Sequence, residues 1–89
     1  MQQALELKVD LVVMGGYLRY GVLKSGTHVA RTQRMSDDVF VDFDAESQIL
    51  GIEILSFNDD EAIDVARRFA AAHGLEFPKF LAHKALASA

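Results

Sequence analysis

VFVDFDAESQILGIEIL, residues 39–55, is the stretch that decides the fold of this 89-residue chain. Apolar and polar residues alternate on both sides of a short polar segment, which predicts a β-hairpin whose two strands each bury one face. The apolar residues pair so that all of them share that face: Val39 with Ile54, Val41 with Ile52, and Phe43 with Leu50. A one-residue slip would turn one set to the other face, so the pattern specifies this register.

The opposite face of this hairpin is mixed rather than polar. Phe40, Ile49 and Leu55 are expected on it, among acidic residues. Three apolar residues on a face that would otherwise be wet indicate that something covers it. The cover can be the C-terminal tail, a second copy of the chain or a different protein. These three are the predicted interaction residues.

Three more strands are predicted on the N-terminal side. Residues 5–13 alternate between apolar and polar and predict a strand with one buried face. Gly15-Gly16 is the expected turn after it. Residues 17–23 predict a second strand, and after a turn at residues 24–26 comes a weaker third strand ending at Met35.

A single amphipathic helix is predicted between Asn58 and Gly74. Asn58 is a favourable N-cap, and Gly74 is the expected terminator, with Leu75 folding back on Ala70. Pro78 can begin a short helical tail. These elements predict an α+β fold in which the helix packs on an antiparallel β-meander of about five strands. Residues 1–89 are expected to form one domain, with the meander in 1–56 and the helical part in 57–89.

Composition excludes several function classes. The net charge of −4 argues against nucleic acid as a partner, because phosphate binding requires a basic surface. Without cysteine there is no disulfide framework and no thiolate chemistry. The N-terminal segment has no basic residue before Lys8, and Asp10 interrupts its apolar run. Neither a signal peptide nor a membrane span is therefore expected, and a cytoplasmic location is the default.

Candidate chemical groups are sparse. Asp42, Asp44 and Glu46 begin like a calcium loop, but Ser47 stands where that loop needs glycine, so a solvated hairpin edge is the better interpretation. Asp42 and Glu53 share the outer face without an obvious pocket. The three histidines lie far apart and lack metal-ligand spacing. We therefore predict no catalytic, cofactor-binding or metal-binding residues.

Three arginines allow two interpretations. Arg31 and Arg34 fall in or beside the weak third strand, and Arg19 falls in the second. They could form a small basic patch for an acidic partner. Arg31 and Arg34 could equally be the charges that protect an edge strand from aggregation.

The segment from Tyr17 to Ser56 resembles a family of small, mostly bacterial proteins, domain of unknown function 2283 (DUF2283). The residues that carry the resemblance are YLRYGVL, then VFVDFD, a short turn and ILGIEIL. The chain departs from the family pattern in that turn, which usually carries a glycine, and before the strand at residues 17–23, where Gly15-Gly16 stands in place of the usual aspartate. The resemblance implies a compact β-meander and brings no catalytic residues. Similar proteins are sometimes found beside small toxin-like proteins, which implies an antitoxin-like binding role.

The leading functional hypothesis is a non-catalytic protein-binding module. Its expected partner is itself, as a homodimer, or another small protein. The alternative is a small-ligand-binding protein or an enzyme that uses a cleft between sheet and helix. Burial of Phe40, Ile49 and Leu55 by a partner would favour the first, and a cleft gathering Asp42, Glu53 and a histidine would favour the second.

Overall fold

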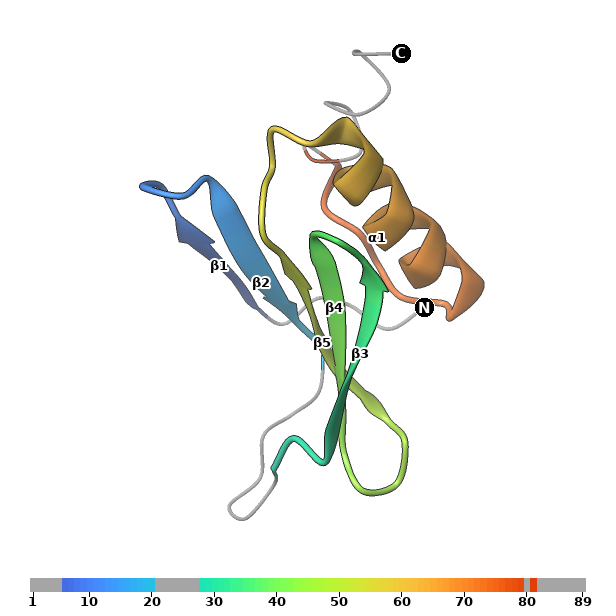
Figure 1. Cartoon of the computed structure of the whole chain (residues 1–89). Helices are drawn as coiled ribbons and strands as arrows, with labels where there is room; N and C mark the ends of the chain where they lie inside the picture. The colour runs from blue at the N-terminus through green and yellow to red at the C-terminus, as the bar shows by residue number, and fades with distance from the viewer. Residues whose placement is uncertain (1–5, 21–27, 80, 82–89) are drawn as a thin grey trace.

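The computed structural model describes residues 6–20, 28–79 and 81, which form one antiparallel sheet with a helix on one face (Figure 1). The helix is α1 (Asp60–Ala72). The strands are β1 (Glu6–Asp10), β2 (Gly15–Arg19), β3 (Arg31–Ser36), β4 (Val39–Phe43) and β5 (Ile49–Ile54). Their order in the sheet is β1-β2-β5-β4-β3, so β3, β4 and β5 form a meander and β2 pairs with β5. The predicted α+β class is confirmed.

The β4–β5 register agrees with the alternation except next to the turn. Val39 lies opposite Ile54 and Val41 opposite Ile52, as predicted. The third predicted pair is wrong, because Phe43 lies opposite Ile49 and the register shifts by one residue at this point. Leu50 is therefore the extra residue of a β-bulge.

The turn geometry explains this bulge. The Ser47 amide donates to the Asp44 carbonyl at 3.1 Å, and the Asp44 amide donates to the Gln48 carbonyl at 3.0 Å. Ser47 has a φ of 62°, which gives a three-residue loop ending in a left-handed residue. Such a loop places Phe43 opposite Ile49, whereas the buried face requires Val41 opposite Ile52. The bulge reconciles the two registers.

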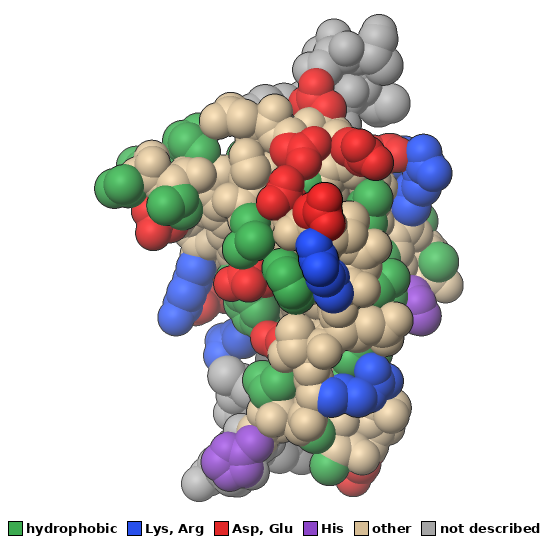
Figure 2. Space-filling view, in the orientation of Figure 1, with side chains coloured by type: hydrophobic (Ala, Val, Ile, Leu, Met, Phe, Trp, Pro, Cys, Tyr) green, Lys and Arg blue, Asp and Glu red, His purple; other side chains and the backbone are tan. Residues whose placement is uncertain are grey.

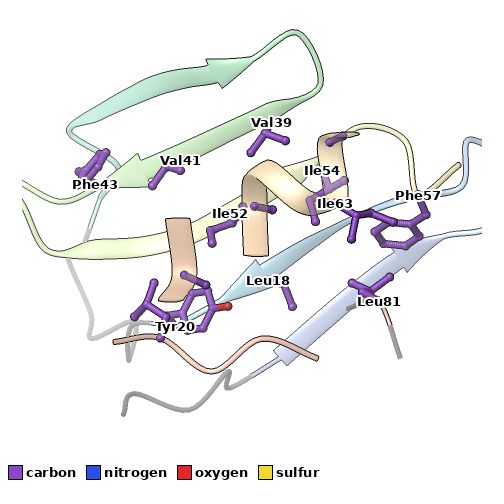
Figure 3. Packing of buried hydrophobic residues seen from close by; sticks show 14 residues of the cluster. Leu18, Tyr20, Val39, Val41, Phe43, Ile52, Ile54, Phe57, Ile63 and Leu81 are labelled. Atoms are coloured by element: carbon purple, nitrogen blue, oxygen red, sulfur yellow. The ribbon is translucent and has the colours of Figure 1, made fainter. Parts of the chain in front are cut away.

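The core lies between the sheet and α1 (Figure 3). Leu18 of β2 and the alternating residues of β4 and β5 point toward Ile63 of the helix. Three alanines on the buried helix face allow close packing against the sheet: Ala62, Ala66 and Ala70. The largest fully buried side chains are Tyr20, Leu18, Ile52, Ile54, Ile63, Leu81, Val39 and Val41.

The helix begins one residue later than predicted. Asp59, not Asn58, is the N-cap, and its Oδ1 accepts hydrogen bonds from the Glu61 amide at 3.0 Å and the Ala62 amide at 3.3 Å. Asparagine and aspartate are about equally good caps, so pattern alone could not choose between adjacent positions. The charge of Asp59 also favours the positive end of the helix dipole.

The end of the helix was predicted correctly. Gly74 has a φ of 66°, and the Leu75 amide donates to the Ala70 carbonyl at 2.8 Å, which is the Schellman arrangement. The chain then returns over the helix-covered face, where the Tyr20 hydroxyl donates to the Glu76 carbonyl at 2.6 Å. Leu81 is buried there. Most of the predicted helical tail lies outside the described residues.

The first turn is not at the two glycines, as predicted, but at Leu11–Met14. Asp10 closes it, because its Oδ1 accepts hydrogen bonds from the Val12 amide at 2.9 Å and the Val13 amide at 3.3 Å. The second strand therefore starts at residue 15 rather than 17. The third strand starts at residue 31, and the predicted turn at 24–26 lies outside the described residues.

The glycines are needed inside β2 because neighbouring atoms come too close for a side chain. A Cβ on Gly15 would lie 2.7 Å from the Leu55 carbonyl oxygen. A Cβ on Gly16 would lie 2.6 Å from the Lys8 carbonyl oxygen and 2.7 Å from the Phe57 ring. The glycine pair thus marks close packing within the sheet, not a turn.

Candidate functional site

The β1–β2 hairpin ends in exposed apolar side chains, which gather at its tip (Figure 2). Together with Leu55, which follows β5, they form what we call the hairpin patch. Its members and their exposed fractions are Val9 (44%), Leu11 (77%), Val12 (93%), Val13 (61%), Met14 (37%) and Leu55 (43%).

A hollow of about 300 Å³ lies between part of the hairpin patch and the neighbouring surface of the sheet. Val13, Tyr17 and Leu55 contribute apolar surface to it, and Lys8 and Glu53 contribute charges. Because Tyr17 is paired with both Lys8 and Glu53 across the strands, this hollow lies on the face of the sheet away from α1.

The predicted burial of one face of the first strand is wrong. Leu7 alone in β1 is partly buried and packs against the core. The helix α1 lies against β3, β4 and β5, so β1 at the far edge receives no helical cover. The alternation predicted the strand correctly but could not show whether a second layer reaches it.

The three predicted interaction residues occupy different places. Leu55 lies in the hairpin patch. Phe40 is half-buried on the outer face, opposite Glu53. Ile49, displaced by the bulge, lies opposite Phe43 and packs against the core, so it does not share a surface with the other two. Their role in an interaction stays a prediction.

The centre of the outer face holds a hydrogen-bond network around Asp42, which is half-buried, whereas Glu46 at the turn is exposed as predicted. Asp42 accepts hydrogen bonds from the Tyr17 hydroxyl at 3.0 Å and the Thr32 hydroxyl at 2.5 Å. Burial, the hydrogen bond to Asp42 and the charges of Asp42 and Glu53 raise the pKa of Tyr17 above its ordinary value. This shift keeps Tyr17 protonated, and so a hydrogen-bond donor, to a higher pH than an ordinary tyrosine. Its ring covers Gly51, where any side chain would collide with it.

The three arginines do not form one basic patch. Arg19 in β2 is separated from β3 by β5 and β4. Arg31 places its guanidinium 3.9 Å from the centre of the Phe43 ring, and Arg34 forms an ion pair with Asp37 at 2.5 Å. Both lie on the exposed edge strand β3, which favours the interpretation that they protect this edge.

Among the described residues, neither Asp42 nor a histidine lines the hollow beside Glu53. In the ranges 6–20, 28–79 and 81, no three histidine or carboxylate side chains lie together so that they could hold a metal ion. His73 is exposed and stacks on Phe69, with 4.3 Å between ring centres. Of the part of the chain that is described, no helix is long and apolar enough to cross a membrane.

Sequence reasoning missed most of the hairpin patch. Leu11 and Val13 continue the alternation of the first strand, so they were expected on its buried face. The available signal was Asp10, a residue that commonly caps turns through its own carboxylate. Placing the turn after Asp10 would have exposed the apolar run that follows.

Comparison with known proteins adds a family and nothing more specific. No curated protein and no solved structure matches the chain significantly. The sequence model of one family does match, and the matched segment begins in β2 and ends just before α1. Leu55 is the one member of the hairpin patch inside it. The resemblance noted from the sequence is thereby confirmed: residues 17–58 match the family described as protein of unknown function, DUF2283.

Proposed function

We propose that this protein is a non-catalytic protein-binding module whose contact surface is the hairpin patch. The observation that carries the proposal is the turn Leu11–Met14, in which four consecutive apolar side chains are exposed. Contiguous exposed apolar surface on a small protein is typical of an interaction site. The partner is a second copy of the chain or another small protein, as in antitoxin-like pairs.

Turn formation does not account for these residues. Hairpin turns favour glycine, asparagine and aspartate, which adopt the required backbone angles easily. Here Met14 has a φ of 53°, which is costly for a residue with a side chain. Asp10 supplies the hydrogen bonds that close the turn, so the four positions after it are available for contact.

Small-ligand binding is the second candidate, and the hollow of about 300 Å³ favours it. Its apolar walls and its two charges, Lys8 and Glu53, suit a small amphipathic molecule. Unlike the cleft expected from the sequence, this hollow lies on the face away from α1. A ligand there would contact Tyr17 and Leu55 but leave Val12 in solvent.

Val12→Asp is the variant that tests the proposal. Val12 is almost fully exposed, so the substitution should leave the free energy of unfolding unchanged while placing a charge in the hairpin patch. Sedimentation velocity of the purified chain, up to about 100 µM, should show association of the wild type and its loss in the variant. Co-purification of the tagged chains from the native host extends the comparison to a different partner.

Two results would contradict the proposal. One is a wild-type chain that stays monomeric in sedimentation velocity and that co-purifies with the same proteins as Val12→Asp. The other is association that Val12→Asp leaves intact. Val29→Asp serves as the matched control, because Val29 is an exposed valine (51%) that lies outside the hairpin patch.

A further inference from the structure

We propose that a second copy of the chain binds at β1, by antiparallel pairing of the two β1 strands about a two-fold axis at Val9. This inference rests on the proposed function, because it names the partner and its register. It would join the sheets of the two copies into one continuous sheet. Among the described residues, β1 pairs only with β2 and is an open edge.

The backbone N–H and C=O groups of β1 point in the directions that this pairing needs. The Lys8 carbonyl points toward β2, since its oxygen lies 2.6 Å from the position of a Cβ on Gly16. Backbone groups alternate in direction along a strand, so Leu7 and Val9 direct their N–H and C=O groups toward the open edge. An axis at Val9 lets the two Val9 residues exchange both hydrogen bonds.

Charge excludes one register. An axis at Lys8 would place the two Lys8 side chains opposite each other and Glu6 opposite Asp10 of the second copy. Like charges directly opposite each other destabilise a strand pair. An axis at Val9 instead places each Lys8 opposite Asp10 of the second copy, which gives two pairs of opposite charge.

Burial distinguishes Val9 from the other charge-matched axis, at Leu7. Leu7 already packs against the core of its own chain, so pairing it with itself buries little more. An axis at Val9 brings together the two Val9 side chains, which are 44% exposed, and brings Leu11, the first residue of the turn and 77% exposed, to the end of the pairing near Leu7 of the second copy. The hydrophobic gain is therefore larger at Val9.

The other edge of the sheet is unsuited to the same pairing. β3 carries Arg31 and Arg34, and its register with β4 shifts between Arg34 and Ser36. Charged side chains and bulges are the devices that block edge-to-edge association. β1 has no register shift against β2.

A mixing experiment with Lys8→Glu and Asp10→Lys tests the register. Each variant alone places like charges opposite each other and should dimerise at least about tenfold more weakly than the wild type. In an equimolar mixture the glutamate introduced in one variant faces the lysine introduced in the other. The unchanged Asp10 of the first then faces the unchanged Lys8 of the second, so heterodimers should form. Sedimentation velocity of each variant and of the mixture gives the readout.

Val9→Pro provides a test that does not depend on the turn, which Asp10→Lys could loosen. The Val9 N–H points to the open edge, so proline should be tolerated in the folded chain yet remove the central intermolecular hydrogen bonds. Far-UV circular dichroism checks that each variant folds. We expect a folded monomer.

The outcomes separate this inference from the proposed function. If Val12→Asp abolishes association but Val9→Pro and both charge variants do not, the hairpin patch binds in another way and the edge pairing is wrong. If Lys8→Glu weakens the dimer and Asp10→Lys does not, the axis lies at Leu7, which also overturns the register. A wild-type monomer overturns the inference, and the proposed function then depends on the co-purified partner.

Discussion

The strands β4 and β5 and the strand β1 have the same alternating pattern but opposite environments. Val39, Val41 and Ile52 are completely buried, whereas Val9 and Leu11 are exposed. The difference lies in the layer above. The helix lies against β5, β4 and β3, the segment after it packs into the same core, and β1 lies beyond this cover. Alternation therefore indicates a strand, while burial depends on what packs against it.

A charge substituted into each region should produce the largest contrast. Val41→Asp places an unpaired carboxylate in the core and should destabilise the chain by more than about 4 kcal/mol, which is enough to unfold it. Val12→Asp, at the tip of the hairpin, should change the free energy of unfolding by less than about 0.5 kcal/mol. Urea unfolding measures both, and comparable losses would contradict the contrast.

A methyl group added in β2, which lies between β1 and β5, should have the next largest effect on the free energy of unfolding. Gly16→Ala brings a Cβ against the Lys8 carbonyl and the Phe57 ring, so we expect a loss of about 2–3 kcal/mol. The control is Gly74→Ala, where no neighbouring atom lies within 4 Å and only the positive φ resists. The free energy of unfolding of Gly74→Ala should fall by about 1 kcal/mol. Thermal unfolding measures both glycine variants. A harmless Gly16→Ala would mean that β1 does not pack as tightly on β2 as the structure shows.

The polar network on the outer face should contribute a smaller amount. Asp42→Ala removes the acceptor of the Tyr17 and Thr32 hydroxyls and should cost about 1–2 kcal/mol. Glu53→Ala, on the same face and exposed, should stay within about 0.5 kcal/mol. Urea melts of the two variants compare them directly, and an equal response would show that the network does not stabilise the sheet.

The smallest expected change is a gain. Ser47 adopts a left-handed conformation in the β4–β5 turn, with a φ of 62°. Ser47→Gly should raise the free energy of unfolding by about 0.5 kcal/mol, because relief of the backbone cost exceeds the added freedom of the unfolded chain. Ser47→Ala is the matched control and should bring no gain. A loss in Ser47→Gly would show that the serine side chain itself supports the turn.

Local patterns were sufficient for much of the fold. The α+β class, two of three pairs in the β4–β5 hairpin and the Gly74 terminator followed from alternation and capping chemistry. These features depend on residues close in the chain, whose backbone preferences act without distant partners.

The remaining features were decided by contacts between distant segments. The pairing of β2 with β5 places Gly15 and Gly16 against Leu55 and Phe57, so two residues that suggest a turn lie inside a strand. The reach of α1 decided that the first strand would be exposed, and with it most of the hairpin patch. By itself the sequence determined where strands and the helix could form. Tertiary packing determined which of their faces stayed in water, because the area covered by a second layer depends on the whole sheet and not on the local pattern.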